Sequence, residues 1–265
     1  MQEAKISVIT VCLNTVNTIR ETIESVLGQT YDNIEYLIVD GMSVDGTLDI
    51  IRQYEDIQSV KICSGKDNGL YNAMNKGVDL CSGDYVLFLN SGDVFADQDA
   101  VSDVVASICG SDAIGNGWMN KSLLPDIVYG NVTKIYQDKS ITEKYPGRNK
   151  VFKLLMMGKM PCHQGIFTKT SVLRRFQFDE SYKICADFDF LLRCLHAGVR
   201  MRYVDVTVSV VDCITGISSQ KTNIDRMRVE DDRSIRENYP LMYWLMWMPK
   251  KMVRARGRQV KGNIK

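Results

Sequence analysis

Four short apolar runs, each ending in a polar turn, alternate with helix-like segments in the N-terminal third of the chain. The runs are Ile6–Leu13, Ile34–Val39, Val60–Cys63 and Tyr85–Leu89. Their continuous, β-branched character is typical of strands that are covered on both faces. The helix-like segments between them are Thr18–Leu27, Thr47–Tyr54 and Leu70–Leu80. This alternation predicts an α/β fold, with an open, Rossmann-like and mostly parallel central sheet flanked by helices.

The remaining chain continues the mixture of strands and helices without any internal repeat. We expect helices over Gln98–Cys109, Phe188–Ala197 and Asn223–Asn238, and strands over Asp126–Tyr136, Ser140–Tyr145 and Met201–Val211. The two strands on either side of residue 138 are expected to pair, and the highly charged Asn223–Asn238 helix is expected to be solvated. Arg148–Phe167 contains no pattern that assigns it to a helix or a strand.

Composition excludes several classes of protein. The 265 residues carry a formal net charge of +1, which argues against a nucleic-acid-binding surface. The eight cysteines lie singly, without a CxxC pair, as expected of reduced thiols in a cytosolic compartment. Met1–Lys5 has no signal-peptide character, and no apolar run is long enough to span a bilayer. We therefore expect a cytoplasmic protein.

Two acidic residues follow predicted parallel strands, Asp40 after the second run and Asp93 after the fourth. Open parallel sheets bind ligands at the carboxyl ends of their strands, so these side chains are candidates for one nucleotide site. Asp93 is interpreted as the ligand of a divalent metal that neutralises a diphosphate. The alternative for both residues is helix capping or turn formation, which Asp commonly performs.

Three further positions carry candidate chemistry. Asp67 lies in a glycine-containing loop, where it either caps the next helix or contacts a base, ribose or phosphate. Asp187 opens the predicted Phe188–Ala197 helix, as a simple N-cap or as a general base facing the crevice. His163 and Gln164 form a polar pair between apolar stretches and are interpreted as substrate contacts.

The C-terminal segment combines aromatic and basic residues. Leu241–Met248 is apolar and includes two tryptophans, and seven cations follow it without any acidic residue. Those cations are Lys250, Lys251, Arg254, Arg256, Arg258, Lys261 and Lys265. Aromatic side chains beside basic ones are typical of an interfacial anchor on anionic lipid. The alternative is a packed terminal helix, which explains the aromatics but not the cations.

Several motifs together resemble family 2 glycosyltransferases, which are inverting enzymes with the GT-A fold. The resemblance is strong from Ile6 to about Asp103 and weaker beyond. The matching pieces are ISVITVCLN, TIESVLGQTYDNIEYLIVDGMSVDGT, DNGLYNAMNKG, GDYVLFLNSGDVF, PCHQGIF and KICADFDFLLR. The chain looks like the bacterial branch that builds O-antigen, capsule and related lipopolysaccharide or polysaccharide chains.

The resemblance implies a role for each candidate residue. Asp187 matches the carboxylate that deprotonates the acceptor hydroxyl, and Asp93 matches the acid that binds Mn²⁺ or Mg²⁺. His163 and Gln164 match a loop that faces the donor sugar and the acceptor. The nucleotide-sugar contacts would be Val11, Asn14, Asp40, Asp67, Asn90, Ser91 and Gly92.

Two positions depart from the family pattern. The metal motif is reduced to Asn90, Ser91, Gly92 and Asp93, so a single carboxylate remains and the diphosphate and water must supply other ligands. Gly41 stands where many relatives carry a second Asp after the position of Asp40.

The expected activity is transfer of a sugar from a nucleotide diphosphate sugar, with UDP-hexose favoured by the resemblance, to a lipid-linked saccharide. The acceptor would sit on a polyprenyl diphosphate, and the enzyme would lie peripherally on the inner face of the cytoplasmic membrane through residues 241–265. We expect a GT-A domain over residues 1–230, with a nucleotide-sugar half at 1–110 and an acceptor half at 111–230. A helical, basic tail would follow at 231–265.

Other classes are weighed against this one. A nucleotidyltransferase normally has a glycine-rich phosphate loop near its start, and residues 6–17 contain no glycine. A dehydrogenase is excluded because no G-x-G-x-x-G follows the first strand. A non-catalytic, sugar-nucleotide-binding module remains an alternative because the metal motif is reduced.

Overall fold

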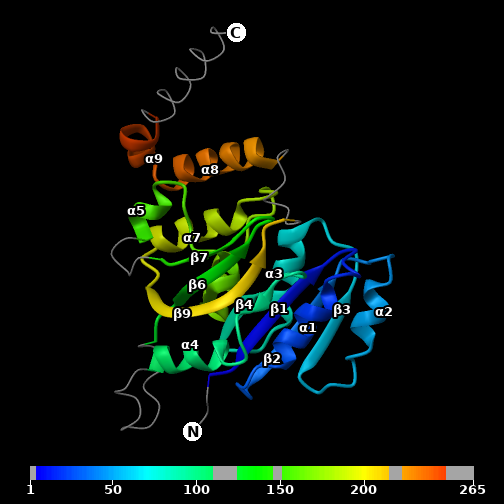
Figure 1. The fold of residues 1–265 in the computed structure, drawn as a ribbon. Helices are drawn as coiled ribbons and strands as arrows, with labels where there is room; N and C mark the ends of the chain where they lie inside the picture. Colours follow the sequence, from blue (N-terminus) through cyan, green and yellow to red (C-terminus); the bar gives the residue numbers. More distant parts are fainter. Residues whose placement is uncertain (1–3, 110–123, 146–150, 215–222, 249–265) are drawn as a thin grey trace.

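The computed structural model describes residues 4–109, 124–145, 151–214 and 223–248. A nine-stranded sheet runs through the centre in the order β3-β2-β1-β4-β8-β6-β9-β5, with β7 paired to β6. Strands β1–β4, β6 and β9 run in one direction, and β5, β7 and β8 run in the opposite one. This confirms the α/β class and the mostly parallel sheet (Figure 1).

The N-terminal strands match the apolar runs closely. They are β1 (Ile6–Cys12), β2 (Ile34–Asp40), β3 (Val60–Ser64) and β4 (Tyr85–Phe88). The helices between them are α1 (Ile19–Leu27), α2 (Thr47–Arg52) and α3 (Leu70–Leu80). All four strands pair in parallel, and Cys12 lies opposite Asp40 in the register, so the last residues of β1 and β2 end at the same edge.

The two faces of this sheet bury alternate residues of each strand against different helices. Ile9 and Val11 of β1 belong to the core that includes α3 and α7, whereas Ile6 and Val8 belong to the core beneath α1 and α4. Because both faces are covered, the strands are apolar at nearly every position. Burial of these side chains, at about 25 cal/mol per Å², is the main force that holds the layers together.

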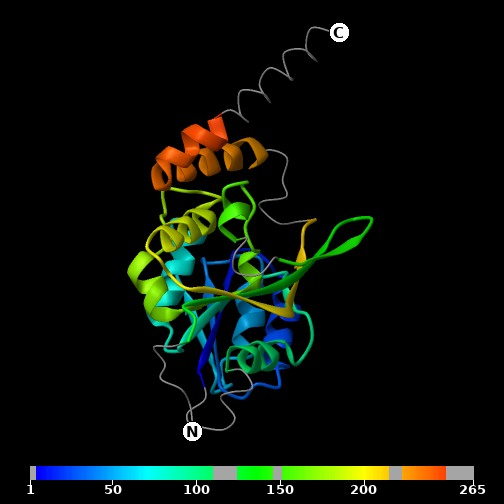
Figure 2. The same ribbon diagram turned by 90° about the vertical axis from the view of Figure 1, so that its left-hand side faces the viewer.

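The chain after β4 mixes short strands with helices. Its strands are β5 (Val94–Phe95), β6 (Ile127–Ile135), β7 (Ser140–Glu143), β8 (Ile166–Lys169) and β9 (Met201–Asp212). The expected pairing of the strands around residue 138 is confirmed by the antiparallel β6–β7 hairpin, which projects from the body in Figure 2. Its helices up to residue 196 are α4 (Ala100–Cys109), α5 (Val151–Leu155), α6 (Thr170–Phe176) and α7 (Ala186–His196).

From residue 151, where its described part begins, the unassigned stretch before β8 contains α5 and the 3₁₀ turn η3 (His163–Gly165). Gly165 ends this turn against β6, where a Cβ atom would lie 2.7 Å from Cγ2 of Val132. Any larger residue would push the turn away from the sheet. The close approach therefore fixes His163 and Gln164 at the sheet edge.

The chain closes with α8 (Ile224–Asn238), α9 (Pro240–Met242) and the π-helical turn η6 (Tyr243–Trp247), which lie beyond α7 (Figures 1 and 2). The expected charged helix over Asn223–Asn238 is confirmed by α8, but the expectation that it is solvated is wrong for Glu230, Ser234 and Ile235, which are buried. Residue 230, the expected domain boundary, falls inside this helix. The basic residues after 249 lie outside the described part of the chain. Within that part, no helix has both the length and the apolarity to traverse a bilayer.

Candidate functional site

The side chain of Asp40, the last residue of β2, is fully buried. Its carboxylate accepts hydrogen bonds from the Ser64 hydroxyl at 2.7 Å and from the Ser43 amide at 3.2 Å. It therefore fixes the turn after β2 and the end of β3. Any contact of Asp40 with a nucleotide stays a prediction.

Asp67 lies next to this turn and forms an ion pair with Lys76 of α3. The helix that follows Asp67, α3, begins after Gly69 and has no side-chain cap, so Asp67 is not the capping residue. A Cβ atom on Gly41 would lie 3.3 Å from Oδ2 of Asp67 and 3.4 Å from Leu13. The glycine that departs from the family pattern thus leaves room for Asp67 beside the strand end.

Asn14 connects the loops that follow β1 and β2. Its backbone is left-handed, with φ of 54°, a conformation that Asn tolerates better than most residues. Its backbone N–H donates to the Ser43 hydroxyl at 2.8 Å, and its side-chain oxygen accepts from the backbone N–H of Val44 at 2.9 Å. Val11 is buried in β1, one residue before Cys12, which lies opposite Asp40 in the register.

The loop after β4 is held by α1. The Ser91 hydroxyl lies 3.2 Å from the Thr18 hydroxyl, and the Gly92 amide donates to the Thr22 hydroxyl at 3.0 Å. Gly92 has φ of 98°, which favours glycine. These contacts turn Asn90 towards the second half of the protein.

Asp93 is 5% exposed and lies immediately before β5. Its carboxylate accepts from Nε2 of Gln164 at 2.7 Å and from the Asp212 amide at 3.2 Å. Burial raises the pKa of Asp93 to about 6, although both hydrogen bonds oppose the shift. The contact with Gln164 joins the β4 loop to η3.

His163 joins the same loop to α7. One ring nitrogen, Nε2, lies 3.0 Å from Nδ2 of Asn90, and the other, Nδ1, lies 3.2 Å from Oδ2 of Asp187. The amide NH₂ group can only donate and a carboxylate only accepts, so these contacts fit an imidazole that accepts at Nε2 and donates from Nδ1. His163 thus connects the two halves of the site.

Asp187 is the second residue of α7, not the residue that caps it; the capping position is Cys185. Its Oδ1 accepts from the Phe188 amide at 2.9 Å and lies 3.3 Å from the Tyr71 hydroxyl. The side chain remains 17% exposed, so the carboxylate is fixed in place yet open on one side. Such a group can accept a proton from a hydroxyl placed against it.

Sequence reasoning missed two residues around Asp187. Tyr71 of α3 reaches both Asp187 and the Ile184 carbonyl, and Glu230 of α8 binds the backbone just before α7. Tyr71 lies inside the DNGLYNAMNKG motif, which could have indicated it. Glu230 stands in a strongly charged helix, where nothing in the sequence distinguishes it from its solvated neighbours.

The donor set around Asp93 suits a metal only in part. Among the described residues, no cluster of three or more His, Cys, Asp or Glu side chains could hold an ion alone. The Oδ1 atom of Asn90 is buried without a hydrogen-bond partner. One carboxylate and one free amide oxygen fit Mg²⁺ or Mn²⁺ that arrives with a diphosphate, because such ions take most ligands from phosphate and water.

Comparisons of the sequence with known proteins agree on one family. The family model for Glycosyl transferase family 2 matches residues 7–182. A PGL/p-HBAD biosynthesis glycosyltransferase of Mycobacterium tuberculosis is 30% identical over 217 residues, which cover 80% of this chain and 78% of that protein. The Escherichia coli protein WfaP, a UDP-Glc:alpha-D-GlcNAc-diphosphoundecaprenol beta-1,3-glucosyltransferase, is 39% identical over 88 residues, 33% of this chain and 35% of that protein.

Solved structures share the fold at low sequence identity. S. aureus TarS 1-349 in complex with UDP-GlcNAc superposes with a TM-score of 0.66 at 18% identity, covering 91% of this chain and 73% of that one. The mannosyltransferase PcManGT from Pyrobaculum calidifontis, in complex with GDP-Man and Mn²⁺, gives a TM-score of 0.58 at 13% identity, covering 98% and 81%.

Proposed function

Because the chain belongs to glycosyl transferase family 2 and is a glycosyltransferase of GT-A fold, we propose that it moves a hexose from a UDP-sugar to a lipid-linked saccharide with inversion. The observation that carries this proposal is the Asp187 carboxylate, held at the start of α7 and linked through His163 to the loop after β4. The base and the loop expected to hold the donor thus belong to one hydrogen-bonded unit.

The donor would lie along the ends of β1, β2 and β4. The residues proposed to contact it are Val11, Asn14, Asp40, Asp67, Asn90, Ser91 and Gly92. The related TarS structure is a complex with UDP-GlcNAc, and the name of WfaP specifies UDP-Glc, which supports a uridine nucleotide as donor.

Asp93, with Asn90 beside it, is the proposed anchor for Mn²⁺ or Mg²⁺. GT-A glycosyltransferases typically use a divalent metal, and the PcManGT structure contains Mn²⁺. Bound there, the cation would stabilise the negative charge that develops on the departing diphosphate. Gln164 holds the Asp93 carboxylate in place by donating to it.

In the proposed reaction, Asp187 accepts the proton of the acceptor hydroxyl while that oxygen forms a bond to C1 of the sugar. The bond between C1 and the diphosphate oxygen breaks on the opposite face, so the anomeric centre inverts and UDP leaves. His163 orients Asp187 by donating from Nδ1, and it lies beside Asn90, where donor and acceptor would meet. Fixed geometry of this kind contributes a large share of the rate.

The acceptor is proposed to be a saccharide on a polyprenyl diphosphate, as in O-antigen or capsule assembly. Support comes from WfaP, whose name includes a diphosphoundecaprenol acceptor, and from the C-terminal helices. Leu241, Trp244 and Leu245 are 70%, 61% and 65% exposed, whereas Tyr243 is buried against α8. An exposed apolar surface before seven cations is suited to anionic lipid on the inner face of the cytoplasmic membrane.

The function is tested by incubating the protein with a panel of UDP-hexoses, Mn²⁺ and a synthetic GlcNAc-diphospholipid acceptor. We expect transfer from at least one donor, with a product of inverted anomeric configuration by NMR. Omission of the acceptor is the control for donor hydrolysis. A product with retained configuration, or no transfer from any UDP-hexose, would contradict the proposal.

Membrane attachment is tested separately by flotation with vesicles of phosphatidylglycerol and phosphatidylethanolamine. Replacement of Leu241, Trp244 and Leu245 by Ser should reduce the floated fraction, because exposed apolar area is lost. Vesicles of phosphatidylcholine alone are the control for the charge requirement. Equal flotation of variant and parent on the anionic vesicles would exclude this surface as the anchor.

A further inference from the structure

A buried carboxylate on α8 binds three successive backbone amides just before α7. Oε1 of Glu230 accepts from the Lys183 amide at 3.0 Å, and Oε2 accepts from the amides of Ile184 and Cys185, both at 2.9 Å. Glu230 is 9% exposed. Three hydrogen bonds from one backbone turn to a buried charge are stronger than the same number between neutral groups. We call residues 183–185 the clamped turn.

The opposite side of the clamped turn is held by α3. The Tyr71 hydroxyl donates to the Ile184 carbonyl and also lies 3.3 Å from Oδ1 of Asp187. Glu230 therefore binds the amides of the turn, and Tyr71 binds a carbonyl of the same turn. Asp187 follows the turn by only two residues, so its main chain cannot move independently of these contacts.

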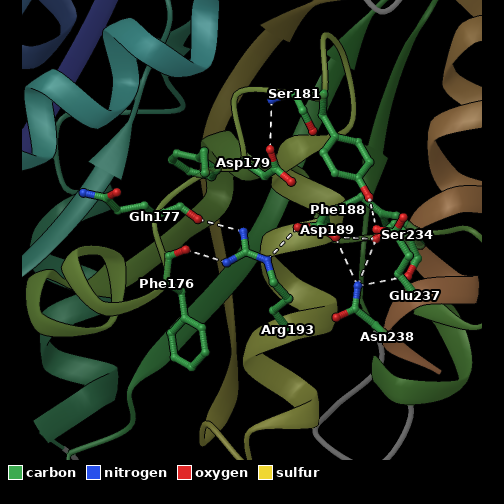
Figure 3. Close-up of polar contacts among 12 residues, drawn as sticks. Phe176, Gln177, Asp179, Ser181, Phe188, Asp189, Arg193, Ser234, Glu237 and Asn238 are labelled. Carbon is green, nitrogen blue, oxygen red and sulfur yellow. Dashed lines mark hydrogen bonds and ion pairs between the residues drawn. The ribbon is translucent and has the colours of Figure 1, made fainter.

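A second group of contacts fixes α8 to α7 one turn further along (Figure 3). The buried carboxylate of Asp189 accepts from the Ser234 hydroxyl at 2.9 Å and from Nδ2 of Asn238 at 3.1 Å. Its other oxygen accepts from Nε of Arg193 at 2.6 Å. The position of Glu230 relative to α7 is thus set by contacts that do not involve the clamped turn.

We propose that Glu230 is a positioning residue for Asp187: by binding the clamped turn, α8 sets where the base carboxylate stands relative to His163 and the acceptor hydroxyl. The inference rests on the proposed function of Asp187. Glu230 binds the clamped turn and not the carboxylate of Asp187 itself, so its removal should lower turnover and leave donor binding intact. A displacement of about 1 Å in a reacting group can lower the rate roughly a hundredfold.

The alternative is that Glu230 stabilises the fold without affecting the base. A purely stabilising residue would lower the unfolding temperature of the variant, while the folded fraction would turn over at the parent rate. Glu230→Gln helps to separate the two cases. The Gln side chain has the same size as Glu and keeps one acceptor oxygen. Compared with Glu230→Ala, this variant should therefore retain part of the hydrogen bonding and part of the rate.

The first measurement is hydrogen–deuterium exchange on the full chain, with Glu230→Ala, Glu230→Gln and Asp225→Asn. Asp225 is the matched control, since it lies in the first turn of the same helix, is 87% exposed and pairs with Arg228 on that helix. In Glu230→Ala we expect exchange at residues 183–185 to accelerate about tenfold or more, with β1 unchanged. Unchanged exchange at 183–185 would overturn the clamp.

The second measurement is turnover with the UDP-hexose that the parent uses, corrected for folded fraction by circular dichroism. We expect kcat to fall about a hundredfold in Glu230→Ala and about tenfold in Glu230→Gln, with an unchanged donor KM and parent rates in Asp225→Asn. Parent kcat in folded Glu230→Ala would overturn the positioning role. Full activity in Asp187→Asn would instead overturn the proposed base, and the exchange result would still decide whether Glu230 binds the turn.

Discussion

The region up to residue 109 and the region from residue 124 onwards contribute to the site in different ways. In the first, candidate groups follow parallel strands whose register brings their ends together, as with Cys12 and Asp40. In the second, His163 and Asp187 stand on a single 3₁₀ turn and on the first turn of a helix. Their positions depend on side-chain contacts with residues far away in sequence, such as Tyr71, which is 116 residues from Asp187.

From this difference we infer that the first region binds the donor and the second region positions the catalytic group. A sheet edge is rigid because every strand is fixed by its neighbours, and it suits the binding of a nucleotide. A catalytic group held by a few hydrogen bonds can be set accurately but is lost easily when one bond is removed. Variants of the candidate site residues in the first region should therefore weaken donor binding, and those in the second should lower turnover with donor binding intact.

The largest effect is expected for Asp187→Asn. The amide cannot take the acceptor proton, so kcat should fall about 10³-fold, within the range of general-base catalysis. UDP affinity by calorimetry should not change. Asp103→Asn, an exposed first-turn acid of α4, is the control. Loss of UDP affinity in Asp187→Asn would remove the proposed distinction between the two regions.

Asp93→Asn should have the next largest effect and should follow the pattern of the first region. Loss of the carboxylate proposed to bind the metal is expected to lower turnover about a hundredfold and to weaken UDP binding in Mn²⁺. With EDTA present, parent and variant should bind UDP alike. If the parent protein binds UDP with the same affinity in Mn²⁺ and in EDTA, Asp93 does not act through a cation.

His163→Ala tests the connection between the regions. Removal of the imidazole deletes the hydrogen bond to Asp187 and the contact with Asn90, and we expect kcat to fall about tenfold. The matched control is His196→Ala, since His196 is the last residue of α7, far along the helix from Asp187, and its ring centroid lies 5.4 Å from that of Tyr239. Equal losses in both variants would indicate a general effect of removing a histidine.

The smallest effect on activity is expected for Glu35→Gln in the first region. Burial alone would raise the pKa of Glu35, but hydrogen bonds from Lys61, Ser82 and Ser7 outweigh it and lower the pKa to about 2. The ionised group therefore stabilises the fold above pH 4.5, and this contribution is lost as pH falls towards 2.

In Glu35→Gln, the free energy of unfolding at pH 7 should fall by about 1–3 kcal/mol, with less change between pH 5 and 3 than in the parent. Urea denaturation at several pH values measures this, and Glu21→Gln, an exposed residue of α1, is the control. Folded Glu35→Gln should turn over normally, and a fall in kcat would connect this buried group to the site.

The sheet of the first region could be predicted because its signal is local. The run Tyr85–Leu89 predicts a strand that the structure ends at Phe88, and Ile34–Val39 predicts one that it ends at Asp40. The acids at these ends could be named as candidates for the same reason. Asp40 is the last residue of a buried strand, and Asp93 lies in the polar turn after another buried strand.

The second region could be predicted only in its longer elements. The turn that carries His163 has three residues, and its place is set by Gly165 against β6 and by bonds to Asn90 and Asp93, none of which is local. The sequence predicts Asp187 at the start of this helix, as an N-cap or as a general base, because Asp commonly caps helices. The amides before α7 are instead satisfied by Glu230, a carboxylate supplied from another helix.

The separation of 47 residues between Lys183 and Glu230 has a consequence for how the enzyme matures. On the ribosome, β1–β4 emerge early and can pair while the rest of the chain is still being made. The stretch ahead of α7 has no carboxylate to bind until α8 has been synthesised. A nascent chain would therefore complete the strand ends proposed to bind the nucleotide before α8 has emerged to hold the turn ahead of Asp187.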